Sequence, residues 1–240
     1  MTFQLTEPIL IIGLGGVGTR LAEKTKKTLN SDCLMISHDQ RDLTTENSIK
    51  ISTKSVVNPS IHLIRGSTLE TSDEIQKNIT NYSTVILMSN LAGKAGAGIG
   101  PIVSKICKQE QKNLLSFVVM PFKFEKERIF QSGVALKRIR QDSQCTIVVD
   151  NDALLDSNPD LTQKQCYDIS NKAIESMMHS LKSSEISEST NILSTSKNTG
   201  DIEASLKDSL RMLYEDAPPN SIKRSMLYVY GSNNIPVGVL

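Results

Sequence analysis

The sequence NLAGKAGAGIGP, at residues 90–101, determines the fold class that we predict for this chain. It follows a short apolar run, STVILMS at residues 83–89, and leads into a stretch with helical spacing. A second glycine-rich turn, GLGGVG at residues 13–18, has the same setting. Glycine lets a backbone approach a ligand closely, and the amide groups that open a helix attract phosphate. We expect the two turns to converge over one pocket and to hold a longer phosphate chain than one turn could.

The composition argues against several classes of protein. A length of 240 residues suits one large domain, or a domain with a small appendage. The 27 basic and 26 acidic residues nearly cancel, so no basic field attracts nucleic acid or an anionic membrane. The four cysteines lack CxxC spacing, the N-terminus lacks a signal-peptide layout, and no apolar run approaches the roughly 20 residues of a membrane helix. We therefore expect a cytoplasmic protein with no nucleic-acid partner and no direct membrane insertion.

Short apolar runs alternate with helical segments over the first two thirds of the chain. The runs that we expect as strands are residues 9–13, 33–37, 83–89, 114–120 and 145–150. This alternation predicts an α/β fold, a Rossmann-like parallel sheet with helices on both faces.

Three signals mark expected helix starts. Thr71 with Glu74, and Thr162 with Gln165, have the spacing of a capping box. Pro101 falls where a first-turn proline is tolerated. The helix behind Thr162 continues to about residue 181, so it would be about 30 Å long.

The C-terminal part of the sequence predicts a boundary after this long helix. Residues 1–182 form the expected nucleotide-binding domain, and residues 183–200 have the polar, small composition of a loop or linker. Residues 201–240 predict a reduced or truncated α+β segment, with an amphipathic helix at 202–213 and a strand, SMLYVYG, at 225–231. The apolar ending of the sequence is compatible with truncation.

The first glycine turn also matches a weaker, more general pattern. Gly13, Gly15 and Gly18 fit GxGxxG, and Asp39 follows at the end of the next expected strand, where a ribose-binding acid belongs. This pattern permits a Rossmann enzyme that uses NAD or ATP, although no catalytic residue for one is evident. A tight turn without any ligand is the simpler alternative.

The order of segments from residue 9 to about residue 181 resembles the GTP-binding domain of the FtsZ/tubulin superfamily, nearer to FtsZ than to tubulin. GLGGVGT resembles the first phosphate loop of the family, and AGKAGAG at residues 92–98 occupies the position of its signature GGGTGTG. PFKFE at residues 121–125 resembles the PFxFEG motif, and IVVDND at residues 147–152 resembles a family strand that ends in ND. The resemblance implies a divergent prokaryotic or archaeal member with a long central helix and GTP or GDP as cofactor, with Mg²⁺ as a candidate companion.

The candidate cofactor-binding residues follow from this resemblance and from the glycine turns. They are Gly15, Gly16, Thr19, Asp39, Gly93, Lys94, Ala95, Gly96, Ala97, Gly98, Glu125, Arg128, Asn151, Tyr167 and Asn171. The resemblance implies that Glu125 and Arg128 face the ribose and phosphates, that Asn151 and Asn171 bond to the nucleoside, and that Tyr167 stacks on guanine. Otherwise Tyr167 is an ordinary half-buried ring and Arg128 a solvated helix residue.

The sequence also departs from the family pattern. Both threonines of GGGTGTG are alanines, Ala95 and Ala97, so two hydroxyl donors are lost, and Lys94 replaces a glycine. The Lys94 ammonium could face the phosphates as a point charge, or it could point to water. Lys172 stands where the family has an aspartate that reads guanine, and an ammonium cannot accept those hydrogen bonds. The base selectivity therefore stays open.

The motif that completes hydrolysis across a subunit contact in this family, NxDxxD, is absent. Only Asp201 and Glu203 could replace its carboxylates, and both also suit the start of an amphipathic helix. We expect weak or absent GTP hydrolysis and assign no catalytic residue. The three histidines match no metal or nucleophile motif, so we expect them to be structural or on the surface, and we expect no protein metal site.

Three functions remain open from the sequence. The first is an FtsZ-like GTP-binding protein of the cytoskeletal or cell-division type, which could associate head-to-tail into filaments. The second is a degenerate homologue that binds no nucleotide and acts through protein contacts. The third is the Rossmann enzyme described above.

Overall fold

The computed structural model describes residues 2–54, 57–197 and 200–229. Its core is a seven-stranded sheet in which every neighbouring pair is parallel, in the order β4-β3-β2-β5-β6-β7-β9. The strands are β2 (Ile9–Leu14), β3 (Asp32–Ser37), β4 (Ser48–Lys50), β5 (Thr84–Asn90), β6 (Asn113–Met120), β7 (Cys145–Asp150) and β9 (Ser189–Ile192). The predicted α/β class with a parallel sheet is confirmed.

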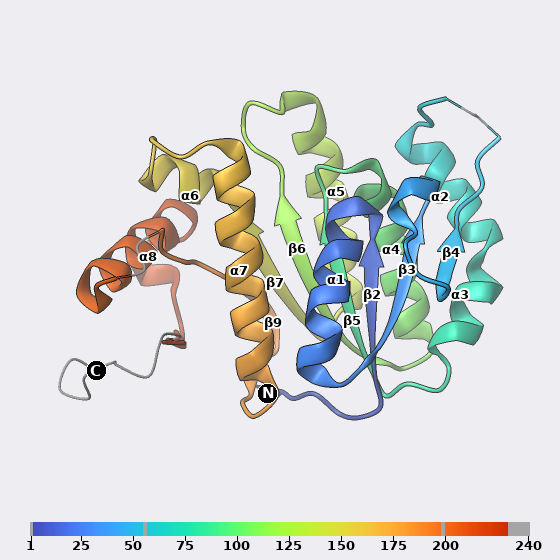
Figure 1. Ribbon diagram of the computed structural model, residues 1–240, viewed down its shortest axis with the longest axis horizontal. Coiled ribbons are helices and arrows are strands. Elements are labelled where there is room, and N and C mark those ends of the chain that lie inside the picture. The colour runs from blue at the N-terminus through green and yellow to red at the C-terminus, as the bar shows by residue number, and fades with distance from the viewer. Residues whose placement is uncertain (1, 55–56, 198–199, 230–240) are drawn as a thin grey trace.

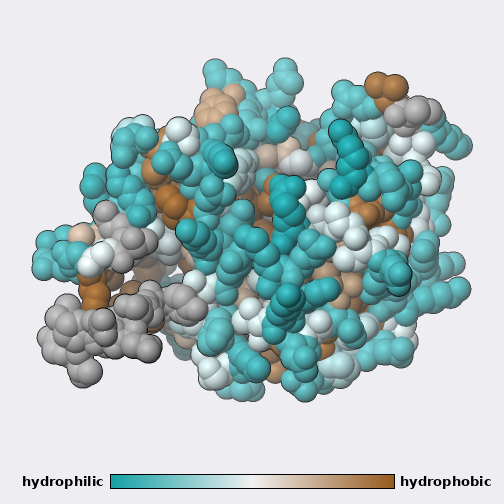
Figure 2. Space-filling view, viewed as in Figure 1, coloured by the Kyte–Doolittle hydropathy of each residue, from teal (hydrophilic) through white to brown (hydrophobic). Residues whose placement is uncertain are grey.

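Helices cover both faces of this sheet (Figure 1). One face carries α1 (Gly15–Leu29) and α7 (Gln163–Leu181), and the other carries α2 (Ile61–Glu70), α3 (Ser72–Ile79), α4 (Lys94–Gln109) and α5 (Lys126–Asp142). The helices α6 (Asn151–Ser157) and α8 (Ile202–Asp216) pack against each other to the side of α7 (Figure 1). Successive strand residues point to opposite faces, so Ile11 joins the core under α1 and α7, while Ile12 joins the core under α3 and α4. Burial on both sides explains why the central strands read as unbroken apolar runs. The outer surface of α1 and α7 is mainly hydrophilic (Figure 2).

The strand order reverses between β2 and β5, which are neighbours in the sheet. From β2 the chain first builds outward through β3 and β4, and it then returns to place β5, β6 and β7 on the other side. In open parallel sheets, ligands bind outside the carboxyl ends of the strands at such a switch point. Helices α1 and α4 both start there, within the two glycine-rich stretches.

The long helix α7 begins as the sequence predicts. Thr162 and Gln165 form a complete capping box, and the helix extends over 19 residues, about 28 Å. It packs on α1, where Lys24 and Glu175 form an ion pair of 3.0 Å. The capping box predicted at Thr71 is wrong, because α2 leads directly into α3 and the Thr71 hydroxyl donates to the Ser67 carbonyl instead.

Helix α4 starts earlier than the proline suggested. It begins at Lys94, so most of the glycine- and alanine-rich stretch is itself helical, and Pro101 lies in the helix interior. Proline has no N–H, so the carbonyl of Ala97, four residues earlier, loses its helical donor. Arg65 from α2 donates Nη2 to that carbonyl at 3.3 Å. A side chain of a neighbouring helix thus replaces the missing backbone bond.

The polar stretch after α7, expected as a loop or linker, contains two short strands instead. β8 (Ile186–Ser187) pairs antiparallel with β1 (Thr2–Phe3), and β9 adds a parallel edge strand beside β7. β9 reads STNI, and an edge strand of this composition lacks the apolar pattern of the central strands. The amphipathic helix α8 is present as expected.

The strand predicted at 225–231 is not found. The described part of that stretch, residues 225–229, forms no strand, and residues 230–231 lie outside the described residues. Within the described ranges, no helix is both long enough and apolar enough to cross a membrane.

Candidate functional site

The two glycine-rich turns meet at the switch point of the sheet. Gly15 has a φ of +63°, and a Cβ on it would lie 2.8 Å from the Cβ of Ala95. Only glycine suits this conformation and this contact. Gly96 lies against the end of β5, where a Cβ would come within 2.1 Å of the Asn90 carbonyl oxygen. The two turns therefore lie in contact with each other, as the expected convergence requires.

Both helices that start at these turns leave their first amide groups uncapped by a side chain. The N-cap residues are Leu14 for α1 and Gly93 for α4, neither provides a side-chain cap, and neither first turn contains an acidic residue. In α4 the first helical bond runs from the Ala97 amide to the Gly93 carbonyl, so the amides of the three preceding residues are not used within the helix. A capping side chain opens α2, α6, α7 and α8, whereas α3 and α5 also lack one but contain an acidic residue in the first turn. Two positive helix ends thus point to one place and favour an anion there.

Tyr167 of α7 forms part of the wall beside the second turn. Its hydroxyl lies near the side chains of Asn90, at the end of β5, and of Gln163. Burial is the main reason why the pKa of this hydroxyl is raised, while both of these side chains lower that pKa. The half-buried ring packs edge-on against Phe122, with ring centroids 5.5 Å apart. Tyr167 therefore places an aromatic ring of the long helix beside the end of β5.

Glu125 and Arg128 lie beside this ring. Arg128 donates Nη1 to Glu125 at 2.7 Å, and the Phe122 amide donates to the other carboxylate oxygen at 3.1 Å. Charges on Glu125 and Arg128 both act on the Tyr167 hydroxyl. The structure thus brings these three predicted residues together at the carboxyl end of β6.

Asn151 and Asn171 present buried polar atoms without partners. Asn151 is fully buried, and its Oδ1 accepts a hydrogen bond of 2.6 Å from the Ser170 hydroxyl. Neither Asn151 Nδ2 nor Asn171 Oδ1 has a partner among the described residues. An unsatisfied buried donor or acceptor is costly, so such atoms mark a place where a polar ligand group is expected.

Lys94 faces the segment that precedes α2. Its Nζ donates to Asn58 Oδ1 at 2.5 Å and to the Pro59 carbonyl at 2.9 Å. Of the two orientations expected for this side chain, the one toward water alone is therefore not found. Through these hydrogen bonds, the Lys94 ammonium connects the start of α4 to the residues just before α2.

Asp39 and Asp42 sit in the turn after β3, and only Asp39 was expected to matter. The Arg41 guanidinium bonds to both oxygens of Asp39 and holds the pKa of that carboxyl well below its ordinary value. Asp42 was missed by the sequence reasoning, yet its Oδ1 lies 2.7 Å from the position of a Cβ on Gly16. A single acid in a loop carries no periodic signal that would have singled it out.

His38, on the same turn, was also passed over. Its Nδ1 is buried without a partner among the described residues. Burial lowers the pKa of the His38 imidazole, against the opposing influence of Asp39 and Asp42, and Lys94 lowers it further. His38, Lys94 and Asp42 thus surround the same end of the site.

Some predicted residues do not present side chains to the meeting point of the turns. The Thr19 hydroxyl is buried and donates to the Gly16 carbonyl of its own helix at 3.3 Å. Ala97 is fully buried in the core between α4 and α5, and a Cβ on Gly98 would lie 2.9 Å from Ile64 of α2. Lys172 is exposed on α7.

The two acids considered for hydrolysis have local partners. Asp201 caps the start of α8, and Glu203 pairs with Lys207 at 2.6 Å. Their position at the start of a helix is the alternative that the sequence already offered.

Acidic side chains gather where α8 meets the carboxyl end of β7. Burial, followed by the charge of Asp150, raises the pKa of Asp216 to about 7. Asp152 accepts a hydrogen bond from the Lys123 amide, and Lys123 forms an ion pair with Asp156. The described residues contain no group of three or more His, Cys, Asp or Glu side chains arranged to hold a metal ion.

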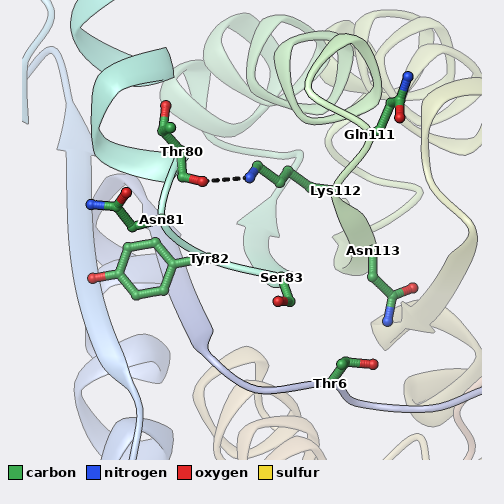
Figure 3. A pocket seen from close by; sticks show the side chains of 8 residues that line it. All are labelled: Thr6, Thr80, Asn81, Tyr82, Ser83, Gln111, Lys112 and Asn113. Atoms are coloured by element: carbon green, nitrogen blue, oxygen red, sulfur yellow. Dashed lines mark hydrogen bonds between the residues drawn. The ribbon is translucent and has the colours of Figure 1, made fainter.

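A cavity of about 420 Å³ lies at the other end of the strands, where they begin (Figure 3). It is lined by Thr6, Thr80, Asn81, Tyr82, Ser83, Gln111, Lys112 and Asn113. Its lysine donates to the Thr80 carbonyl at 2.7 Å, as Figure 3 shows. These residues lie at or just before the starts of β2, β5 and β6, whereas the glycine turns follow the ends of β2 and β5, so the cavity is separate from the candidate site.

Comparison with known proteins places this geometry in a family. The model of the GTPase domain of the Tubulin/FtsZ family matches residues 8–159, which is more than half of the chain. Cell division protein FtsZ 2 of Halobacterium salinarum is 26% identical over 178 residues, which are 69% of this chain and 44% of that protein. Cell division protein FtsZ of Haloferax mediterranei is 33% identical over 115 residues, 48% of this chain and 30% of that protein. The chain thus spans less than half the length of these relatives.

Solved structures give the same assignment of the fold. The FtsZ dimer of M. jannaschii matches with a TM-score of 0.66 and 20% identity, covering 75% of this chain and 57% of that chain. CetZ from Methanosaeta thermophila matches with a TM-score of 0.60 and 16% identity, covering 85% of this chain and 74% of that chain. At these identities the likeness concerns the fold alone.

Proposed function

The chain belongs to the Tubulin/FtsZ family, and we propose that it binds a guanine nucleotide, GTP or GDP, between its two glycine-rich turns. The observation that carries this proposal is the contact between Gly15 and Ala95 at the starts of two helices that lack capping side chains. Amide groups from both helix ends would face the phosphates, which suits a di- or triphosphate better than a single phosphate.

The other end of the site offers what a nucleoside needs. The Tyr167 ring would supply a flat apolar face for the base. Asn151 Nδ2 is an unsatisfied donor and Asn171 Oδ1 an unsatisfied acceptor, and guanine carries both an acceptor, O6, and donors, on N1 and N2. These orphaned atoms favour a ligand with this polarity over an empty apolar gap. The exposed Lys172 would then have no part in reading the base.

Mg²⁺ is proposed only as a companion of the phosphates. Magnesium is usually held by one or two carboxylates together with substrate phosphates, so it does not require a cluster of protein ligands. When bound, it would reduce the negative charge of the phosphate chain.

We further propose weak or absent GTP hydrolysis by this chain. Asp201 is engaged as a helix cap and Glu203 in an ion pair, and neither is arranged with a second acid as a base for water. A cytoskeletal or cell-division role, with head-to-tail association into filaments, follows from the relatives and belongs to the proposal. A contact of that kind is heterologous and gives filaments when it does not close.

Isothermal titration with GTP, GDP, ATP and NAD tests the proposal directly. We expect GTP and GDP to release heat and to raise the melting temperature, and we expect ATP and NAD to do neither at equal concentration. Tyr167→Ala should weaken GDP binding by about fivefold or more, because a lost base stack costs roughly 1–3 kcal/mol. Tyr214→Ala, which changes a tyrosine that is 48% exposed on α8, is the matched control and should bind as the original chain does.

Two results would reject the proposal. Absence of heat and of a thermal shift at millimolar GTP and GDP would leave only a protein-binding homologue. Preference for NAD or ATP would instead support a Rossmann enzyme.

A further inference from the structure

The start of α1 already has an anionic neighbour within the chain. Asp42 Oδ1 lies 2.7 Å from the position that a Cβ on Gly16 would take, and its Oδ2 lies 3.9 Å from the corresponding position on Gly15. A Cβ on Gly15 would also lie 2.8 Å from the Cβ of Ala95, in the second turn. The carboxylate therefore stands where the first and second turns meet.

This carboxylate is fixed in place. The Ser37 hydroxyl, at the end of β3, donates to Asp42 Oδ2 at 2.7 Å. Asp42 is also the last residue of a short 3₁₀ helix, η1 (Gln40–Asp42), which Asp39 caps at its start. The hydrogen bond from Ser37 and the capped 3₁₀ helix together hold the turn after β3 against the first glycine loop.

Arg41 and Lys94 near Asp42 have other partners, while Arg20, whose Nη1 lies 3.5 Å from the same Cβ position on Gly16, forms no ion pair with Asp42 among the described residues. Arg41 forms its close bonds with Asp39, and Lys94 donates to Asn58 and Pro59. His38 is near, but burial opposes its protonation. The negative charge of Asp42 is therefore directed at the helix start, which it stabilises as an acid at an N-terminus does.

We propose that Asp42 competes with phosphate for the start of α1 and so weakens nucleotide binding by this chain. Two anions at one helix end repel each other, and a phosphate can reach the amides only after the carboxylate has moved or been neutralised. This inference rests on the proposed function, because it concerns the same site. It gives Asp42 the role of an affinity-limiting residue and not of a ligand.

The test is the affinity for GDP, measured by titration in EDTA, of the original chain and of Asp42→Asn. We expect Asp42→Asn to bind GDP at least about tenfold more tightly, since it removes a full like charge close to the phosphates. Its melting temperature without nucleotide should fall, because the helix loses its favourable anion. A residue with only a structural role would lower the melting temperature and weaken binding together.

Two further variants sharpen the comparison. Glu46→Gln removes the same charge from an exposed position on the same connection between β3 and β4, and it should leave the affinity unchanged. Asp42→Ala repeats the loss of charge without an amide, in case asparagine disturbs the turn. We expect the same gain in affinity.

The outcomes separate the two proposals. If the original chain binds GDP and both Asp42 variants bind no more tightly, the inference fails while the proposed function stands. If the variants bind more weakly in Mg²⁺ and equally in EDTA, Asp42 is a cation ligand and the inference fails. If no variant binds any nucleotide, the proposed function fails and the inference with it.

Discussion

Arg65 should be important for stability only as long as residue 101 is proline. The Arg65 guanidinium donates at 3.3 Å to the Ala97 carbonyl, which lacks a helical donor because Pro101 has no N–H. We therefore predict that Arg65→Met and Pro101→Ala are coupled. With Pro101→Ala, the new backbone N–H can bond to Ala97 and the guanidinium becomes dispensable.

The magnitude follows from the kind of bond that is lost. A hydrogen bond from a charged group contributes about 1.5–3 kcal/mol, and the long separation here favours the lower end. Arg65→Met alone should therefore reduce the free energy of unfolding by about 1.5 kcal/mol. In the Pro101→Ala background the same change should cost about 0.5 kcal/mol or less, which leaves a coupling energy of about 1 kcal/mol.

Urea unfolding followed by circular dichroism measures this double-mutant cycle. Pro219→Ala provides the control, because Pro219 lies in the short helix η2 (Pro219–Ser221), far along the chain from α4. Arg65→Met and Pro219→Ala should be additive. If Arg65→Met costs the same with and without Pro101, within about 0.5 kcal/mol, the guanidinium does not replace the missing backbone bond and the reasoning is refuted.

Three further predictions concern other parts of the fold. Gly96→Ala should lower the free energy of unfolding by at least about 1–3 kcal/mol, because the new methyl group would meet the Asn90 carbonyl. Gly133→Ala in helix α5 is the control: its methyl group would meet nothing within 4 Å, so this change should raise the free energy of unfolding by up to about 1 kcal/mol in the same urea assay. Thr162→Ala should lower the free energy of unfolding by about 1 kcal/mol because α7 loses its capping box, and an unchanged urea midpoint would contradict this. The pKa of Asp216, about 7 in the folded chain, lies above its ordinary value of 3.8, so the folded state keeps a proton that the unfolded state releases. The contribution of this group to stability should therefore be greatest below about pH 4, fall as the pH rises to about 7 and then level off. Asp216→Asn should flatten that slope between about pH 4 and 7 in the same urea assay.

The sequence predicts the central sheet well because its strands are buried on both faces. The run of β2 contains no polar side chain, β5 has four successive apolar residues at 85–88, and turns and helices separate the two strands. β9 could not be found this way, since an edge strand with solvent on one side needs no apolar run. The start of α4 was misplaced because Pro101 resembles a first-turn proline, while glycine and alanine before it gave no sign that the helix had already begun.

The candidate site was predicted in part. The two turns lie at equivalent points of the strand–helix pattern, so their meeting follows once the strands are ordered. Tyr167, Glu125, Arg128, Asn151 and Asn171 came from resemblance to a family and not from any periodicity. Asp42 depends on how a short loop folds back over α1, which is a long-range contact that no local pattern encodes.

Pairing of β9 with β7 has a consequence for how this protein can be divided. The backbone of Cys145 through Val148 is bonded to the segment from Ser189 to Ile192, and β8 holds the N-terminal strand β1. A polypeptide ending at residue 182 would expose a row of unsatisfied amides and carbonyls along an apolar strand, which invites aggregation. A fragment chosen for expression should therefore extend past the last edge of the sheet, and limited proteolysis between 183 and 192 should be slow in the intact fold.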